Sequence, residues 1–505
     1  MMSHPKSAPS TPRPVPIHGW IRKSELDDYL DRHLPVPTQV VSNGEFFPLP
    51  QTRRQRAVEQ HLMEFAARTA KRLNLDPSVY LRTASGMAGA FAAMNQVFGD
   101  FFAGHADELF DPTAVRANRP DYFIFDVQTH HVAAGRADMQ VQGKLSPMDL
   151  RRTAASLNPE LAKREPRQDD LYLQNYIKEI FIDSETDVAC ITGIPAATED
   201  LNTLPYEEMA RTRRWIDRIT RSVRMVSHGL LAPDMGVQQN CERMQMQAEN
   251  LRIDAWKGYT GLGLGSDPDG WWLDDEQIAY PALEHARRLG VRNICLHKGL
   301  ALGIFNEEHC HPRDIGKAAR DFPDLNFIIY HSGFKSLEEA LPAAGDGFQA
   351  SAYVPWVSDL CRWRKQNPDT TNVYMELGGT FGITVITDPT LCCHVLGMMI
   401  DAFGADHILW GTDSIWLGSP QWQIEALRRL QMPEWLAARF GYEPLTVDVK
   451  RQIFGLNAAG LYGVDPAARR NPVPEDYVDE LKTLYEEAGA AVPSNTQYGW
   501  VRAPD

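Results

Sequence analysis

The residues best suited to chemistry in this sequence are histidines and carboxylates that follow short apolar segments. The first group follows the apolar stretch at 122–127 and comprises Gln128, His130 and His131. Imidazole nitrogens and oxygen ligands suit Zn²⁺ and similar first-row divalent ions. This stretch therefore predicts a metal site at the end of a buried strand.

Ionisable residues also end the apolar segments that come later in the chain. They are His228, Lys257, His297, Lys298, His331, Glu376 and Asp413. A single histidine at a strand end is more often a core or loop residue than a metal ligand. Several separate segments ending in histidine or aspartate are harder to obtain by chance, so the pattern favours one functional site.

Eight apolar segments could supply these strand ends. Their sequences are YFIFDV, TDVACIT, RMVSHG, DAWKGY, NICLHKG, NFIIYHSG, NVYMELGG and HILWGTD. After the first interval they recur roughly every 30 to 45 residues, close to the length of one strand–helix unit. The repeat predicts an α/β fold, a (β/α)8 TIM barrel, in which residues at the C-terminal ends of all the strands meet on one rim.

Segments outside the barrel complete the predicted domain organisation. Apolar residues at helical spacing in 55–73 and 77–102 predict helices, and the simplest interpretation of this region is a cap or a dimer-forming extension. The polar insertion after the first strand predicts a lid over the barrel mouth. The expected divisions are a disordered tail at 1–16, a helical extension at 17–117, the barrel at 118–465 with an insertion or lid at 131–180, and a C-terminal arm at 466–505.

Composition and charge argue against several classes of protein. Of the 505 residues 43% are hydrophobic, enough for a large core, and the net charge of −15 would repel nucleic acid and anionic membranes. No run of about 18 apolar residues exists, which argues against a membrane-spanning helix. The seven cysteines form no CxxC pair, so we expect reduced thiols and a cytoplasmic location. The expected partners are a small-molecule substrate and further copies of the chain, in a homodimer or higher oligomer.

The motifs DVQTHH, LHKG, YHSGF and LWGTDSIW together resemble the amidohydrolase superfamily. The similarity is to the amidohydrolase-related group that contains aminocarboxymuconate-semialdehyde decarboxylase and aromatic-acid decarboxylases, and it covers about residues 121–464. It implies one divalent metal ion, with His130 and His297 as ligands and Asp413 binding the metal or its water. It also implies that His331 polarises the substrate or moves a proton. Zn²⁺ is the expected ion, with Mn, Fe or Cu as alternatives.

One position departs from the pattern of that group. Where the group has the first histidine of a pair, or a glutamate in several decarboxylases, this chain has Gln128. A glutamine carbonyl can bind a metal but is neutral and a weaker ligand. Gln128 is therefore either an oxygen ligand or a hydrogen-bonding residue behind the ligands. His131 should point away from His130 because side chains alternate along a strand, which favours a structural or lid-contacting role.

The remaining strand-end residues each carry two interpretations. Lys257 could be carbamylated to bridge two metals, although a lysine packed in the barrel fits a one-metal group better. Lys298 is either a partner for a substrate carboxylate or an ion-paired loop residue, and Glu376 could orient His331 or water. His228 is a further candidate for substrate binding.

These residues predict a metal-dependent enzyme for a small substrate that bears a carboxylate or a carbonyl group. A divalent ion lowers the pKa of bound water to roughly 7 and polarises a carbonyl. Asp413 and His331 would then be the catalytic acid–base groups. Decarboxylation is favoured over hydrolysis of an amide, lactone or related bond, and a non-catalytic barrel with a degenerate metal site is the remaining alternative.

Overall fold

The part of the chain that can be described is nearly continuous through the predicted barrel. The computed structural model describes residues 20–22, 34–40, 49–141, 146, 168–265, 267–301, 305–341, 353–416, 418–467, 477–487 and 500–502. The predicted tail at 1–16 lies outside these residues. So does half of the predicted lid, at 142–145 and 147–167.

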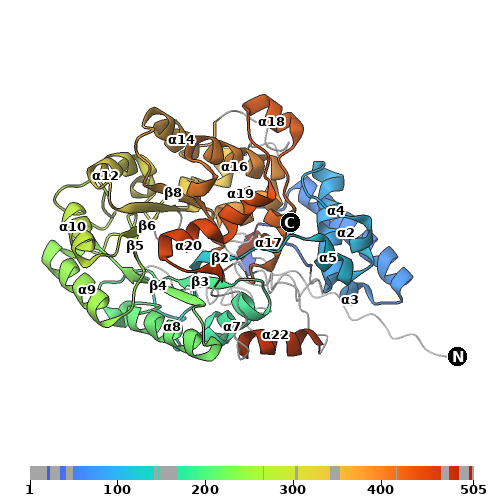
Figure 1. The fold of residues 1–505 in the computed structure, drawn as a ribbon, viewed down its shortest axis with the longest axis horizontal. Coiled ribbons are helices and arrows are strands. Elements are labelled where there is room, and N and C mark those ends of the chain that lie inside the picture. The colour runs from blue at the N-terminus through green and yellow to red at the C-terminus, as the bar shows by residue number, and fades with distance from the viewer. Residues whose placement is uncertain are drawn as a thin grey trace.

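Eight parallel strands form the centre of the molecule (Figure 1). Each strand pairs with the next along the chain, as the sequence predicts for a TIM barrel. They are β2 (Phe125–Thr129), β3 (Val188–Ile191), β4 (Met225–Leu230), β5 (Ala255–Tyr259), β6 (Asn293–His297), β7 (Asn326–Tyr330), β8 (Val373–Glu376) and β9 (Ile408–Leu409). All eight overlap the apolar segments predicted to form strands, and only β2 and β4 run one or two residues past them, so the predicted fold is confirmed.

Backbone hydrogen bonds between the first and last strands close the barrel. The amide of Val127 donates to the carbonyl of Trp410 at 3.0 Å, and the amide of Asp413 donates to the carbonyl of Gln128 at 3.0 Å. One step further, the amide of His130 donates to the carbonyl of Ser414 at 2.6 Å. The closure brings the segment after β9 beside the segment after β2, although almost 300 residues separate them in the sequence.

Alternating side chains divide the strands into an inner and an outer face. The inner face forms an apolar cluster that includes Phe125, Val127, Cys190, Val226, Ala255, Cys295, Ile328 and Leu409. Neighbours on the outer face, such as Ile294, Leu296, Phe327 and Ile329, join the larger core beneath the surrounding helices. This alternation follows from the two-residue period of a strand and fills the barrel centre with side chains.

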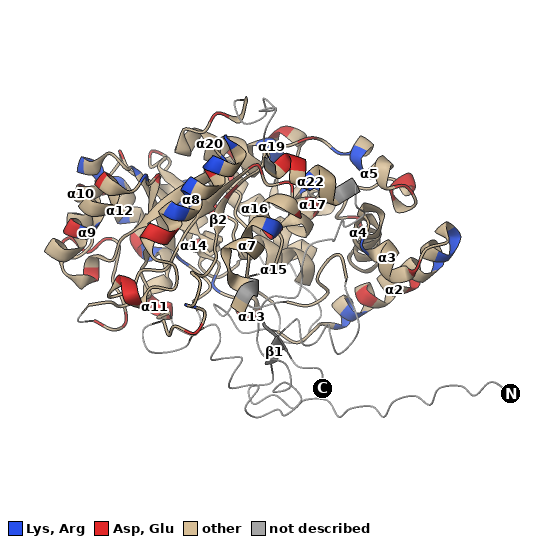
Figure 2. Ribbon diagram, turned by 90° about the horizontal axis from the view of Figure 1, so that it is seen from below, with Lys and Arg blue, Asp and Glu red and all other residues tan. Residues whose placement is uncertain are grey.

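Helices surround the strands and connect most of them (Figure 1). The covering helices are α7 (Leu173–Ile177), α8 (Tyr206–Thr220), α9 (Val237–Asn250), α10 (Tyr280–Leu289), α11 (Glu307–Cys310), α12 (Ile315–Asp321), α13 (Leu337–Ala340), α14 (Val357–Gln366), α15 (Thr380–Thr387), α16 (Pro389–Phe403), α17 (Gln421–Arg429), α18 (Glu434–Phe440), α19 (Val447–Arg451) and α20 (Asn457–Tyr462). Local sequence fixes several starts: Asp388 caps α16 by accepting from the amide of Thr390, just before Pro389. Figure 2 shows acidic and basic residues interspersed along the outer helices.

The region before the barrel is helical, as its apolar spacing predicts. It contains α2 (Arg53–Leu73), α3 (Pro77–Leu81), α4 (Ala84–Phe98) and α5 (Pro112–Asn118) beside the barrel (Figure 1). Asp76 caps α3 by accepting from the amide of Ser78. Arg429 of α17 binds Glu108 at 2.6 Å, which ties this region to the barrel. The domain boundaries themselves stay a prediction.

The two ends of the described chain lie together. Strand β1 (Trp20–Arg22) pairs antiparallel with β10 (Trp500–Arg502). The helix α22 (Tyr477–Glu487) lies within the predicted C-terminal arm and is held to the barrel by an ion pair of 2.7 Å between Arg224 and Asp479. Among the described helices, none is long and apolar enough to cross a membrane.

Candidate functional site

The closure of the barrel brings Gln128, His130 and Asp413 into contact at the C-terminal ends of β2 and β9. Asp413 Oδ1 lies 3.0 Å from His130 Nε2 and 2.9 Å from Gln128 Nε2. The register of β2 against β3 shifts between Asp126 and Thr129, at the point where the polar residues begin. All three contacting side chains are buried, so their polar groups act in a region of low dielectric constant.

The protonation of His130 follows from its two contacts. Its Nδ1 lies 3.0 Å from the carbonyl oxygen of Thr192 and must donate there, because a carbonyl only accepts. Burial, aided by the charge of Lys257, lowers the pKa of His130 to about 3, so the ring is neutral and the Nε2 atom carries a lone pair. This lone pair faces the Asp413 carboxylate. Two electron-rich atoms at 3.0 Å require a cation or a proton between them.

His331 and His297 form a second pair at the ends of β7 and β6. His331 Nδ1 donates to the carbonyl of Gly378 at 2.7 Å, so its Nε2 accepts from His297 Nδ1 at 3.1 Å. Burial lowers the pKa of both rings, that of His331 to about 3. The proton positions leave the lone pair of His297 on Nε2. A ring nitrogen held in this way by its other nitrogen is the usual state of a metal-binding histidine.

Gln128 connects the two pairs. Its Nε2 atom donates to Asp413 and lies 3.5 Å from His331 Nε2. Its Oε1 atom is buried, and no donor among the described residues lies within hydrogen-bonding distance.

The backbone is strained at two site residues. Asp413 has a φ of 59° and His331 a φ of 62°, in the left-handed region that non-glycine residues seldom adopt. Such conformations persist only where the surrounding structure holds them, and they concentrate at functional sites. At His331 the strained backbone is held in part by Glu376, because the Glu376 carboxylate accepts a hydrogen bond from the His331 backbone amide at 3.0 Å.

Glu376 is fully buried beside His331. One oxygen accepts from the amide of His331 and the other from the amide of Gly378 at 2.6 Å. Burial raises the pKa of Glu376 to about 8. The contact with His331 matches the orienting role that the sequence offered for Glu376.

The donor side chains of this cluster are of the types that bind the metal predicted from the sequence. Among the described residues, no three His, Cys, Asp or Glu side chains stand ready to hold an ion, because the donors contact one another in pairs. The chemistry of the donors nevertheless fits a divalent ion. Neutral His130 and His297 and the carboxylate of Asp413 would hold it, and Gln128 Oε1 is a further oxygen donor.

Lys298 does not join this cluster. Its ammonium group donates to Asp314 at 2.7 Å and to the carbonyls of His309 and His311 at 2.8 and 3.2 Å. These contacts use all three N–H donors of a lysine and leave none for a substrate carboxylate. The structure therefore shows the ion-paired alternative for this residue.

His228 also lies away from the cluster. Strand β4 continues for two residues beyond it, so it is not at the C-terminal strand end as the sequence suggested. Its Nε2 atom lies 3.2 Å from the hydroxyl of Tyr462 and 3.4 Å from that of Tyr330, inside the barrel. The Nε2 atom of His228 thus contacts buried hydroxyls in the barrel interior, while its Nδ1 atom has no hydrogen-bond partner among the described residues.

Lys257 and His131 both have structural surroundings. The ammonium group of Lys257 is buried 3.3 Å from the centre of the Tyr330 ring, a cation–π contact within the barrel. His131 contacts the hydroxyl of Thr212 on α8 through Nε2 at 2.8 Å. Both side chains are thus packed against neighbouring groups, and their roles stay predictions.

Three residues at the site were not predicted from the sequence. Thr192 orients His130 through its carbonyl. The ring of Tyr259 stacks on His297 at 5.0 Å between ring centres, and the ring of Phe305 packs against His297 at 4.5 Å in a tilted arrangement. Thr192 ends a predicted strand and could have been suspected, but Phe305 lies in a loop whose sequence carries no such signal.

A cavity of about 310 Å³ lies among the loops that follow β3 and β5. Apolar side chains dominate its walls, and they include Ile194, Pro195, Ala197, Leu201 and Leu264. Ile194 is two residues beyond Thr192, the partner of His130. The cavity is therefore on the same rim as the paired histidines.

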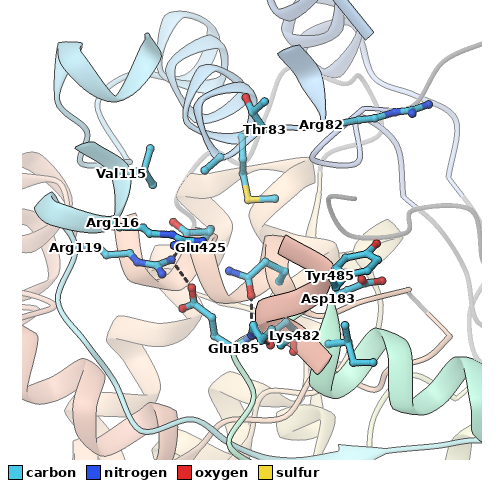
Figure 3. Close-up of a pocket in the computed structure, with 15 residues that line it drawn as sticks. Arg82, Thr83, Val115, Arg116, Arg119, Asp183, Glu185, Glu425, Lys482 and Tyr485 are labelled. Atoms are coloured by element: carbon cyan, nitrogen blue, oxygen red, sulfur yellow. Dashed lines mark hydrogen bonds and ion pairs between the residues drawn. The ribbon is translucent and has the colours of Figure 1, made fainter. Parts of the chain in front are cut away.

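A second cavity, of about 160 Å³, lies where α5, α17 and α22 approach one another (Figure 3). Arg119 forms ion pairs with Glu185 and Glu425 along its wall, and Lys482 donates to the carbonyl of Ser184 at 2.5 Å. Its charged groups are thus largely engaged with one another. They join the helical region and the C-terminal helix to the barrel.

Comparison with known proteins finds a matching family model and solved structures with a similar fold. A family model described as amidohydrolase matches residues 235–464. No curated protein sequence matches the chain. Solved structures with a similar fold include an uncharacterised TIM-barrel protein from Bordetella bronchiseptica, at 16% identity over 68% of this chain and 98% of that chain, with a TM-score of 0.44.

Two enzymes of known reaction are also among the similar structures. For 2,6-dihydroxybenzoate decarboxylase from Rhizobium the identity is 15%, over 68% of this chain and 100% of that chain, with a TM-score of 0.41. For 5-carboxyvanillate decarboxylase from Sphingomonas paucimobilis the identity is 12%, over 68% of this chain and 100% of that chain, with a TM-score of 0.39. The family match covers β5 to β9 and contains His297, His331 and Asp413.

Proposed function

We propose that this protein is a metal-dependent enzyme that acts on a small organic substrate bearing a carboxylate or a carbonyl group, with loss of CO₂ as the favoured reaction. One observation carries the proposal. Neutral His130 Nε2 faces the Asp413 carboxylate at 3.0 Å on the barrel rim, an arrangement that a cation would stabilise. The amidohydrolase match over residues 235–464 supports it.

The site residues divide into those that would bind the metal ion and those that can transfer a proton. A divalent ion at this place would polarise a substrate oxygen and lower the pKa of bound water. His130, His297 and Asp413 would hold it, and Gln128 contributes an oxygen. His331 is fixed by Gly378 and Glu376 with its basic Nε2 toward the cluster, where it can accept or return a proton.

In the carboxy-lyase reaction the bond between the substrate carbon and its carboxylate breaks, and the electron pair stays on that carbon. His331 Nε2 or the Asp413 carboxylate first takes up a proton from solvent and then adds it to the carbon as CO₂ leaves. The apolar cavity beside Ile194 offers space for the carbon skeleton of such a substrate. Burial of the acid–base groups keeps bulk water from competing for the proton.

Hydrolysis is the second candidate function, and one observation favours it. His331 is neutral with its proton on Nδ1, so Nε2 begins as a base and can take a proton from an attacking water. Asp413 is placed to do the same. The same residues therefore serve hydrolysis of an amide, a lactone or a related bond.

Metal analysis followed by a substrate screen tests the proposal. Cells are grown in metal-replete medium, and the protein is purified in buffers to which no metal is added. The metal content of the wild-type protein and of the His297→Ala variant is then measured by mass spectrometry. We expect one divalent ion per chain, with Zn²⁺ as the first expectation, and almost none in the variant. Aromatic and aliphatic carboxylates, amides and lactones are then screened, with CO₂ release separating decarboxylation from hydrolysis. A metal-free, inactive wild-type protein would instead support a non-catalytic barrel.

We infer further that the protein acts in the cytoplasm as a homodimer or higher oligomer. All seven cysteines are free thiols in the structure, which is the usual state in a reducing compartment. Light scattering on a sizing column measures the oligomeric state, and a monomer at micromolar concentration would contradict this inference.

A further inference from the structure

The side-chain amide of Gln128 is turned so that its two ends meet different groups. Its Nε2 atom donates to Asp413 Oδ1 at 2.9 Å, within the cluster of proposed ligands. Its Oε1 atom faces away from Asp413 and receives no hydrogen bond from the described residues. The better metal ligand of the two atoms, the oxygen, is thus directed away from the proposed ion.

The carboxylate of Glu376 borders the oxygen side of this amide. A Cβ atom built on Gly378 would lie 2.0 Å from Gln128 Oε1 and 2.5 Å from Glu376 Oε1, so the two oxygens adjoin the same small space. A Cβ on Gly411 would lie 1.7 Å from Glu376 Oε1. Only glycine at these two positions leaves room for both side chains. The two neighbouring oxygens are both acceptors when Glu376 is ionised.

Turning the amide by about 180° exchanges its two ends. The Nε2 atom would then face Glu376 Oε1 and could donate to it, while Oε1 would face Asp413. Without a cation, Oε1 would meet another acceptor in Asp413, so neither orientation satisfies every group. A divalent ion between Asp413 and His130 removes this conflict, because both oxygens can then bind it.

We propose that Glu376 is a positioning residue that turns Gln128 into an oxygen ligand when a divalent ion binds. The inference rests on the proposed function. In the loaded state Glu376 accepts from Gln128 Nε2, and Gln128 Oε1 faces the ion beside Asp413. Glu376 keeps its contacts with the backbone amides of His331 and Gly378, which fix the carboxylate in place.

This pairing accounts for a neutral amide at a position where a charged or imidazole ligand would bind more tightly. The amide of glutamine can donate to Glu376 through its nitrogen and offer its separate oxygen to the ion at the same time. A glutamate at position 128 would place a second carboxylate against Asp413 in a buried space, where like charges repel strongly.

Zn²⁺ affinity of the whole protein tests the proposal by a double-mutant cycle. Gln128→Met removes the polar ends at similar volume, and we expect it to raise the Zn²⁺ Kd about 10-fold or more. Glu376→Gln should raise the Kd by a similar factor in the wild-type background but should have little further effect in the Gln128→Met background. A general structural role of Glu376 would give the same effect in both backgrounds and would overturn the proposal.

A matched control distinguishes the loss of any buried side-chain amide from the loss of the Gln128 amide. Gln247 is a buried glutamine that donates to the carbonyl of Leu230 and accepts from its amide, on the outer side of the barrel. Gln247→Met should lower stability and leave the Zn²⁺ Kd unchanged. An equal change in Kd would mean that the effect of Gln128→Met is non-specific, and it would contradict the proposal.

A crystal structure with Zn²⁺ supplies the direct measurement. We expect Gln128 Oε1 about 2.0–2.2 Å from the ion and Nε2 within about 3.2 Å of Glu376 Oε1. A separation from the ion beyond about 3 Å overturns this inference while the proposed function stands. If the wild-type protein binds no divalent ion at all, the proposed function fails as well, so the two failures are distinguishable.

Discussion

His130 Nε2 lies 3.0 Å from Asp413 Oδ1, although the histidine has its proton on the opposite nitrogen. The contact joins the first and last strands of the barrel. Its two electron-rich atoms are held together by the backbone bonds that close the barrel, not by mutual attraction. A cation between the two atoms would stabilise this arrangement, whereas burying the two atoms in contact without one costs free energy.

Asp413→Asn should abolish most metal binding and leave the protein folded. The variant removes the only carboxylate among the proposed ligands, and we expect the Zn²⁺ Kd to rise at least 10-fold. Asparagine tolerates the left-handed backbone at this position, where φ is 59°. Calorimetric titration and a thermal melt check both parts, with the exposed Asp401→Asn as control. Unchanged affinity would exclude Asp413 as a ligand.

His297→Ala should lose the metal with little change in fold. The imidazole contributes one proposed ligand, whereas the barrel is held by the apolar packing of its eight strands. Metal content per chain and the circular dichroism spectrum provide the measurements. Wild-type stoichiometry in the variant would show that His297 is not a ligand.

His331→Asn should keep the metal but lose roughly two to four orders of magnitude in turnover, the usual contribution of a positioned acid or base. Asparagine accepts the φ of 62° and can still contact Gly378, so the fold should survive. Turnover is measured on the substrate found in the screen, at full metal occupancy. Near-wild-type turnover would assign His331 a structural role.

Lys298→Met should destabilise the protein by about 3–5 kcal/mol, because it leaves the buried carboxylate of Asp314 without its partner. Metal content should stay at the wild-type level, since Lys298 does not contact the proposed ligands. The free energy of unfolding in urea measures the loss. The double variant Lys298→Met with Asp314→Leu should recover part of it, and a single variant as stable as wild type would contradict this account of the ion pair.

Acidification should destabilise the fold in part through His394, remote from the site. Burial, aided by Arg439, lowers its pKa to about 4 from an ordinary value near 6.5. The unfolded chain therefore binds a proton between these values while the folded protein does not, so stability is full above pH 6.5 and falls as the pH drops toward 4. Glutamine at position 394 can still contact Tyr442. The variant His394→Gln should therefore reduce the decrease in the free energy of unfolding between pH 6.5 and 5 by no more than about 2 kcal/mol. An unchanged pH dependence of urea unfolding would contradict this assignment.

The strands and their order were predictable from the sequence alone. Runs such as NFIIYHSG are apolar, short and evenly spaced, and these properties are local, so they determine a strand–helix repeat before any tertiary contact forms. The helices before the barrel were predictable for the same reason. The position of a polar residue just after a strand then assigns it to one rim, which is how His130, His297, His331 and Asp413 were found.

Which of these residues meet was decided only by the tertiary structure. Lys298 and His297 are adjacent in the sequence, yet Lys298 forms a buried ion pair with Asp314 and His297 contacts His331. They point to opposite sides because side chains alternate along an extended strand. His228 is not at the rim because β4 continues beyond it, a boundary that apolar spacing does not fix. The contact of Gln128 with Asp413, and the place of Glu376 beside both, depend on the closure of β2 against β9. That closure joins residues almost 300 positions apart, so no local pattern in the sequence records it.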